Sequence, residues 1–250
     1  MTGVLLASAG VFGLVIGSFL NVVIYRLPLR KSIIVPRSSC PICNHPLRWY
    51  DNIPIASWII LKGRCRDCRA PISIRYPLVE AGTAVLFVLA GWHFGPTWRL
   101  LIAWGFSAAL IAIGLIDLDH MIIPNKIVLP GAAIGLAASI ALAPERWWVY
   151  LISAGGSTAF LFVLALVWPG GMGLGDVKMA LFMGAVLGAN VLVAMFAAFL
   201  LGSLVGISLI LLHKASRKSR LPFGPFLALG SVIGLFLGDT ILRAYASLCS

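Results

Sequence analysis

The chain has 250 residues, of which 60% are hydrophobic and only 11% are charged. Its mean hydropathy of +1.02 excludes an ordinary soluble domain of this length. The net charge of +11 accompanies no nucleic-acid recognition motif, so we expect no nucleic-acid partner. The composition predicts an all-α, polytopic membrane protein surrounded mainly by the lipid bilayer.

Eight apolar runs approach or exceed the roughly 20 residues that a helix needs to cross the hydrocarbon core. The sixth run is the shortest and fits either a short crossing or a re-entrant segment; we favour the short crossing. The chain then divides into a first transmembrane helix over 1–25, a cytoplasmic loop domain over 26–77 and a membrane domain of about seven helices over 78–250. The predicted runs are residues 4–25, 78–95, 99–118, 127–143, 147–168, 176–189, 191–212 and 224–247.

Basic residues set the predicted orientation. Ten of the 19 Lys and Arg lie between the first two apolar runs, and such an excess marks the cytoplasmic side. A second basic cluster follows the seventh run and falls on the same side when the crossings are counted. The N-terminus is then outside, and both clusters favour anionic lipid headgroups. The first cluster is Arg26, Arg30, Lys31, Arg37, Arg48, Lys62, Arg64, Arg66, Arg69 and Arg75, and the second is Lys214, Arg217, Lys218 and Arg220.

The loop between the first two runs contains CPIC and CRDC, two CxxC pairs separated by 21 residues. This spacing is typical of a four-cysteine zinc ribbon. Thiolates at Cys40, Cys43, Cys65 and Cys68 predict a structural zinc ion that stabilises a loop too small and too basic to form its own core. The alternative is a pair of disulfides, which a reducing cytosol disfavours.

Two acidic stretches lie at the same predicted face of the membrane. LIDLDHMIIPN (115–125) ends the third run, and GMGLGDVKMA (171–180) begins the sixth. Asp117 and Asp119 are rotated by about 200° from each other on a helix, so only one can face Asp176. Two carboxylates in a low-dielectric site tend to share one proton and can activate a water. The alternatives are solvation at a helix end for the first two acids and a helix cap for Asp176.

Residues around Asp176 predict supporting roles. Gly173 and Gly175 lack side chains and allow another group to approach closely. Lys178 either influences the acid electrostatically or extends to the membrane surface. Gly184 and Gly188 form a small-xxx-small pair, and we expect this pair to be a docking face for a substrate helix.

Six stretches follow one another along the chain: GSFLNVVIYRLP (17–28), the two CxxC pairs, ISIRYPLVE (72–80), LIDLDHMIIPN, GMGLGDVKMA and LPFGPFLALG (221–230). Taken in order, they resemble the successive motifs of the bacterial type IV prepilin peptidases, which are GxGD intramembrane aspartyl proteases. The resemblance spans nearly the whole chain. It implies an inner-membrane aspartic endopeptidase that removes the basic leader of type IV prepilins and type II secretion pseudopilins at the cytosolic face. It also implies that Asp117 and Asp176 are catalytic, with Asp119 a helper or a bystander.

The resemblance further implies a second activity, because many members with the cysteine loop methylate the new amino terminus with S-adenosylmethionine. No nucleotide-binding fingerprint accompanies this expectation in the sequence. Glu80 is the candidate acid for methyl transfer, with Arg75 as its partner. The alternative for these two residues is a structural ion pair at the membrane surface.

Two rival classes of protein fit parts of the sequence. Proton-coupled carriers also place acids beside glycine-broken helices, although the chain has no internal repeat between its halves. A membrane-anchored zinc-ribbon adaptor would leave the acids without a role. Asp→Asn substitutions separate the three classes. They would abolish proteolysis in a peptidase and uptake in a carrier, and they would have no effect in an adaptor.

Overall fold

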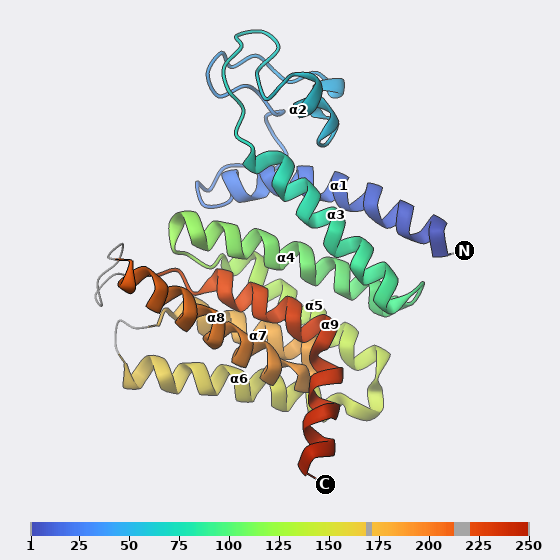
Figure 1. Ribbon diagram of the computed structural model, residues 1–250, viewed down its shortest axis with the longest axis vertical. Coiled ribbons are helices and arrows are strands. Elements are labelled where there is room, and N and C mark those ends of the chain that lie inside the picture. Colours follow the sequence, from blue (N-terminus) through green and yellow to red (C-terminus); the bar gives the residue numbers. More distant parts are fainter. Residues whose placement is uncertain (1, 169–171, 213–220, 250) are drawn as a thin grey trace. The chain divides into compact units, whose positions relative to one another are not determined.

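The computed structural model describes residues 2–168, 172–212 and 221–249 (Figure 1). Over these ranges the regular structure is helical, apart from two isolated β-bridges, Ser39 with Pro46 and Arg64 with Pro71. The prediction of an all-α protein is confirmed. Gly171 and the second basic cluster, Lys214 to Arg220, lie outside the described residues.

The described residues form eight long helices, which correspond to the eight apolar runs. Short helices accompany them: η1 (Trp49–Asn52) and α2 (Ala56–Ile60) in the loop, and η2 (Pro144–Arg146) and η3 (Gly188–Asn190) between long helices. The long helices are α1 (Thr2–Arg26), α3 (Arg75–Phe94), α4 (Trp98–His120), α5 (Asn125–Leu142), α6 (Trp147–Val167), α7 (Leu174–Leu187), α8 (Val191–Leu211) and α9 (Gly224–Cys249).

The described ranges contain seven helical stretches that are long and apolar enough to cross a membrane, one fewer than the predicted eight. The difference lies in Leu174–Leu211, a stretch of 38 residues that includes α7, η3 and α8. A straight helix of that length would be about 57 Å long, nearly twice the hydrocarbon core. Gly188 ends α7 with φ +56°, a backbone angle that glycine adopts without strain, so the stretch is two helices.

The second helix of this stretch, α8, packs along α9. The side-chain amide of Asn190, at the end of η3, donates to Asp239 Oδ1 of α9 at 2.9 Å. Two turns further along α8, Ala198 lies against Gly230, which is nine residues earlier in α9. Because the two contacts move in opposite directions along the chain, α8 runs antiparallel to α9.

The chain forms two compact units, residues 1–112 and 113–250. In the first unit, α1 packs antiparallel to α3, and Asn21 of α1 donates its side-chain amide to the carbonyl of Tyr76 in α3 at 3.1 Å. The ring of Phe87 stacks on Trp104 of α4 with centroids 5.2 Å apart. The division of the chain at residues 25 and 77 follows another criterion, the change between apolar and basic sequence, and stays a prediction.

The second unit contains α5 to α9 and the end of α4. Here α7 packs closely against α6: a Cβ at Gly184 would lie 2.6 Å from Cα of Ala154, and the hydroxyl of Ser157 donates to the carbonyl of Ala180 at 2.9 Å. Gly188 faces the ring of Tyr150, also in α6. The prediction that Gly184 and Gly188 form a docking face for a substrate helix is therefore wrong, because α6 already covers that face.

Candidate functional site

Asp117 lies near the end of α4 and is buried, with 5% of its surface exposed. Its Oδ2 accepts a hydrogen bond of 2.8 Å from the backbone N–H of Gly224, the first residue of α9. A Cβ at residue 224 would lie 2.7 Å from the same oxygen, so only glycine fits there. The carboxylate is thus held at the positive end of the α9 dipole.

Asp176 is the third residue of α7 and is also buried. Its Oδ2 accepts a hydrogen bond of 3.1 Å from the N–H of Gly173, which completes one half of a capping box at the start of the helix. A Cβ at Gly175 would lie 3.0 Å from Cβ of Ile123, in the segment between α4 and α5. At the start of α7, Asp176 therefore caps the helix, as predicted, and the missing side chain of Gly175 allows Ile123 to approach closely.

The two acids interact electrostatically with each other. Each accepts a hydrogen bond from a backbone N–H near the start of a helix, Asp117 at α9 and Asp176 at α7. Two buried carboxylates at this kind of site share a proton more readily than both ionise. A pair that carries one proton can act on a water and a carbonyl together, with one member as base and the other as acid.

The other residues predicted around the pair take separate positions. Asp119 is exposed, two residues along α4 from the buried Asp117. Lys178 donates from Nζ to Oδ1 of Asn125 at 3.0 Å, which connects α7 to the start of α5. Asn125 and Gly224 were not predicted as site residues from the sequence. Both residues lie inside the motif stretches, but the sequence does not indicate which residues they contact.

The four predicted cysteine ligands gather in the loop between α1 and α3. The Sγ atoms of Cys40, Cys43, Cys65 and Cys68 all lie within 4.8 Å of one another, and those of Cys40 and Cys68 are 3.7 Å apart. A tetrahedral ion with metal–sulfur bonds of about 2.3 Å requires sulfur atoms about 3.8 Å apart. The sulfur atoms are too far apart for disulfides, and the cluster is able to bind a metal.

Both halves of this cluster have the same backbone geometry. In each, the N–H four residues after the first cysteine donates back to that cysteine's carbonyl, from Asn44 to Cys40 at 2.9 Å and from Arg69 to Cys65 at 3.1 Å. Asn44 and Arg69 both have positive φ, at 56° and 59°. The backbone N–H groups of Cys43 and Ile42 lower the pKa of the Cys40 thiol to about 6, which favours the thiolate that metals bind.

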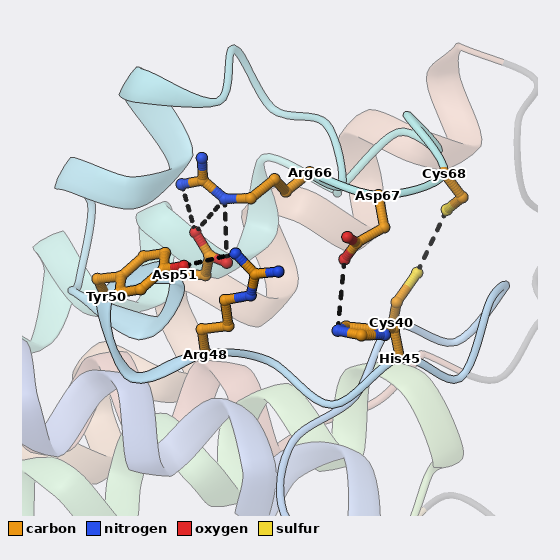
Figure 2. A network of polar contacts seen from close by, with 8 residues as sticks. All are labelled: Cys40, His45, Arg48, Tyr50, Asp51, Arg66, Asp67 and Cys68. Carbon is orange, nitrogen blue, oxygen red and sulfur yellow. Dashed lines mark hydrogen bonds and ion pairs between the residues drawn. The ribbon is translucent and has the colours of Figure 1, made fainter.

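Charged residues connect the rest of the loop to the second half of the cluster (Figure 2). Arg66, next to Cys65, donates to both oxygens of Asp51 in η1, with the shortest contact 2.7 Å. Tyr50 lies beside this pair: its hydroxyl accepts from Arg48 at 2.7 Å, and its ring lies 5.3 Å from the Arg66 guanidinium. The Asp51 side chain is only 6% exposed, whereas the Arg66 side chain is 41% exposed, so one partner of this bidentate pair is buried and the other is open to water.

Glu80 is buried in the second turn of α3 and contacts the loop directly. Its Oε2 accepts a hydrogen bond of 2.7 Å from the N–H of Ile55, and a second hydrogen bond joins its carboxylate to Ser18 of α1. Ile55 precedes α2 and has φ +59°, an angle that a β-branched residue rarely adopts. The carboxylate therefore holds a strained turn of the loop against the first two long helices.

These features define a class: a multi-pass helical membrane protein with a buried aspartate pair and a four-cysteine cluster able to bind a metal. Residues 11–94 match the bacterial peptidase A24 N-terminal domain, and residues 104–207 match the type IV leader peptidase family. With the relatives described next, these matches show that the chain belongs to the type IV leader peptidase family, whose members are A24 aspartic peptidases. The resemblance drawn from the motifs is confirmed.

Curated relatives named prepilin leader peptidase/N-methyltransferase match nearly the whole chain. The protein from Aeromonas salmonicida is 39% identical over 271 residues, covering 94% of this chain and 92% of its own. The Bacillus subtilis protein is 38% identical, covering 94% and 95%. The Pseudomonas aeruginosa protein is 36% identical, covering 93% and 90%. No solved structure matches this chain.

Proposed function

We propose that the chain removes the leader peptide of type IV prepilins or type II secretion pseudopilins and then methylates the exposed amino terminus. The observation that carries the proposal is the buried pair of Asp117 and Asp176, each held by a backbone N–H near the start of a helix. The names of the relatives, which cover over nine-tenths of this chain, support both activities.

Cleavage in this proposal uses one protonated and one ionised aspartate. The ionised member removes a proton from a water that attacks the scissile carbonyl, and the protonated member donates its proton to the carbonyl oxygen. Collapse of the resulting tetrahedral intermediate then breaks the peptide bond. The aspartate that took the proton from the water donates it to the leaving amine. The N–H groups of Gly224 and Gly173 keep both carboxylates aimed while these protons move.

The proposed location is the bacterial inner membrane, with the N-terminus outside and the aspartates facing the cytosol. The ten Lys and Arg between the first two apolar runs support this orientation. A prepilin that is itself an apolar helix with a basic leader would reach the pair laterally from the lipid. Because α6 covers the Gly184 face of α7, the substrate must approach the aspartates by another route.

We propose zinc as the metal of the cysteine cluster, because four thiolates at tetrahedral spacing match its preference. Four protein ligands leave no open position, so the ion stabilises the loop and takes no part in cleavage. For the second activity, S-adenosylmethionine would supply an electrophilic methyl group when bound. Glu80 and Arg75 stay the proposed methyl-transfer residues, with Glu80 placed where α3 meets the loop.

The test is intact-mass analysis of a co-expressed prepilin. Wild type should yield a product without its leader and with one added methyl group, whereas Asp117→Asn and Asp176→Asn should leave the prepilin uncut. Glu145→Gln, at an exposed acid in η2, is the matched control for loss of a carboxylate. Cleavage by both aspartate variants at matched membrane levels would remove the pair from the mechanism and favour the carrier class.

A further inference from the structure

A cavity of about 410 Å³ lies in the second unit, lined by Arg146, Asp239, Leu242 and Arg243. Arg146 ends η2, before α6, and the other three residues lie on α9. Arg146, Asp239 and Arg243 are all exposed, so the cavity is open and both guanidinium groups can be reached from outside. Within the part of the chain that the structure describes, neither lies at ion-pair distance from a carboxylate.

Hydrogen bonds hold the cavity wall in place. Asn190 donates its side-chain amide to Oδ1 of Asp239 at 2.9 Å, and Arg243 donates from Nε to the backbone carbonyl of Asp239 at 3.1 Å. The carboxylate is thereby fixed by η3, while the two terminal nitrogens of Arg243 remain available for a ligand. A guanidinium with its Nε occupied still presents a two-donor edge that matches two oxygens of a phosphate.

The cavity is far from the aspartates along α9. Arg243 is 19 residues beyond Gly224, which contacts Asp117, so about five turns of α9 separate the cavity from the aspartates. Trp147 and Trp148 follow Arg146 directly and are about half exposed, and Tyr245 is 68% exposed. Exposed Trp and Tyr beside arginines are typical of the lipid–water interface.

The charges on the cavity wall indicate the kind of anion. Two arginines and one aspartate sum to a single positive charge, which complements a headgroup whose negative phosphodiester is not offset by a cationic amine. At the interface, phospholipid headgroups are the abundant phosphodiesters. A volume of about 410 Å³ accommodates a headgroup, while the acyl chains would lie along the apolar side chains of α9.

We propose that this cavity binds the phosphate of an anionic phospholipid, at the end of the second unit opposite the aspartates. Arg146 and Arg243 contact the phosphodiester oxygens, and Asp239 positions Arg243 through its carbonyl. The bound lipid connects η2 to α9, two elements that approach each other through this cavity. The proposal does not depend on the peptidase activity.

The experiment is native mass spectrometry of the purified full chain released from phosphatidylcholine vesicles with and without phosphatidylglycerol. Wild type should retain one phosphatidylglycerol, and the Arg146→Gln/Arg243→Gln double variant should bind it at least about tenfold more weakly. Arg243→Lys keeps the charge but loses the two-donor edge, so its affinity should be intermediate. Arg99→Gln, at an exposed arginine of α4, is the control and should bind like wild type.

Three results would overturn the proposal. Undiminished phosphatidylglycerol retention by the double variant would exclude the two arginines as the site. Equal retention of phosphatidylcholine by wild type would exclude selectivity for an anionic lipid. Equal stabilisation of the detergent-solubilised chain by inorganic phosphate, lost in the double variant, would identify free phosphate as the ligand. If the double variant does not fold, Arg243→Lys alone decides, since wild-type affinity in that variant contradicts the bidentate contact.

Discussion

The backbone N–H of Gly224 donates to Oδ2 of Asp117 at 2.8 Å, although the two residues are 107 positions apart in the sequence. Because a Cβ at residue 224 would lie 2.7 Å from that oxygen, Gly224→Ala must displace the carboxylate. We expect the substitution to lower kcat for prepilin cleavage by roughly 10²-fold, since misplacing a catalytic group by about 1 Å has that effect. Cleavage kinetics with purified prepilin measure it.

Gly155→Ala is the control for the Gly224 prediction. Gly155 lies in the middle of α6, where an added Cβ would meet nothing within 4 Å. This variant should fold and cleave like wild type. Wild-type kcat in Gly224→Ala would mean that Asp117 does not need its present position for cleavage.

A second prediction concerns Glu80, whose carboxylate holds the N–H of Ile55. Removing a hydrogen bond to a charged group costs about 1.5–3 kcal/mol, so Glu80→Ala should raise hydrogen exchange around residues 53–60 by roughly tenfold or more. Glu80→Gln keeps an acceptor oxygen and should protect the loop nearly as well as wild type. It should still lose methylation, because the amide cannot act as a carboxylate.

Hydrogen exchange and product mass together decide the role of Glu80. Methylation at the wild-type rate in Glu80→Gln would leave the residue a purely structural one. Loss of loop protection in the same variant would show that the charge, and not the acceptor geometry, holds Ile55.

A third prediction concerns the metal. Chelation or Cys40→Ser/Cys43→Ser should remove one zinc per chain and unfold the loop, while α5 to α9 keep their helical signal, because all four cysteines lie in the loop. Methylation and prepilin recognition should fall before the cleavage step does. Elemental analysis, limited proteolysis and circular dichroism measure these effects, and a loop that resists protease equally after chelation would contradict a structural metal.

The metal should also leave on acidification. The Cys40 pKa of about 6 lies below the ordinary thiol value of 9.0, so ionisation of this group favours the folded loop. The contribution is complete above pH 9, decreases as the pH falls and is gone below about pH 6. Zinc retention measured against pH should therefore drop steeply below neutrality.

A further prediction concerns alkaline pH. A pair of aspartates that works with one shared proton loses activity when that proton leaves, so cleavage by the folded enzyme should fall reversibly as the pH rises. The apparent pKa values that this pH–rate profile yields are properties of the pair as a whole. A rate that stays constant across the alkaline range, with helical content intact, would contradict the shared-proton mechanism.

Local patterns in the sequence were sufficient for much of the fold. The lengths of the apolar runs predict the long helices, and the spacing of the two CxxC pairs predicts that Cys40 and Cys65 lie together. Partners distant in sequence were not predictable in this way. Small residues such as Gly184 indicate a close helix contact without indicating which helix makes it, and the assignment to a substrate was wrong for that reason. Likewise, no periodic pattern in the sequence predicts that Gly224 contacts Asp117.

The brevity of α7 has a consequence for the access of water to Asp176. With 14 residues the helix is about 21 Å long, some 9 Å less than the hydrocarbon thickness. Most of its residues are buried among neighbouring helices, so at least one end of α7 lies below the membrane surface, inside the protein. Asp176 stands at one of these ends, and a recessed helix end there shortens the path by which water reaches an otherwise buried acid.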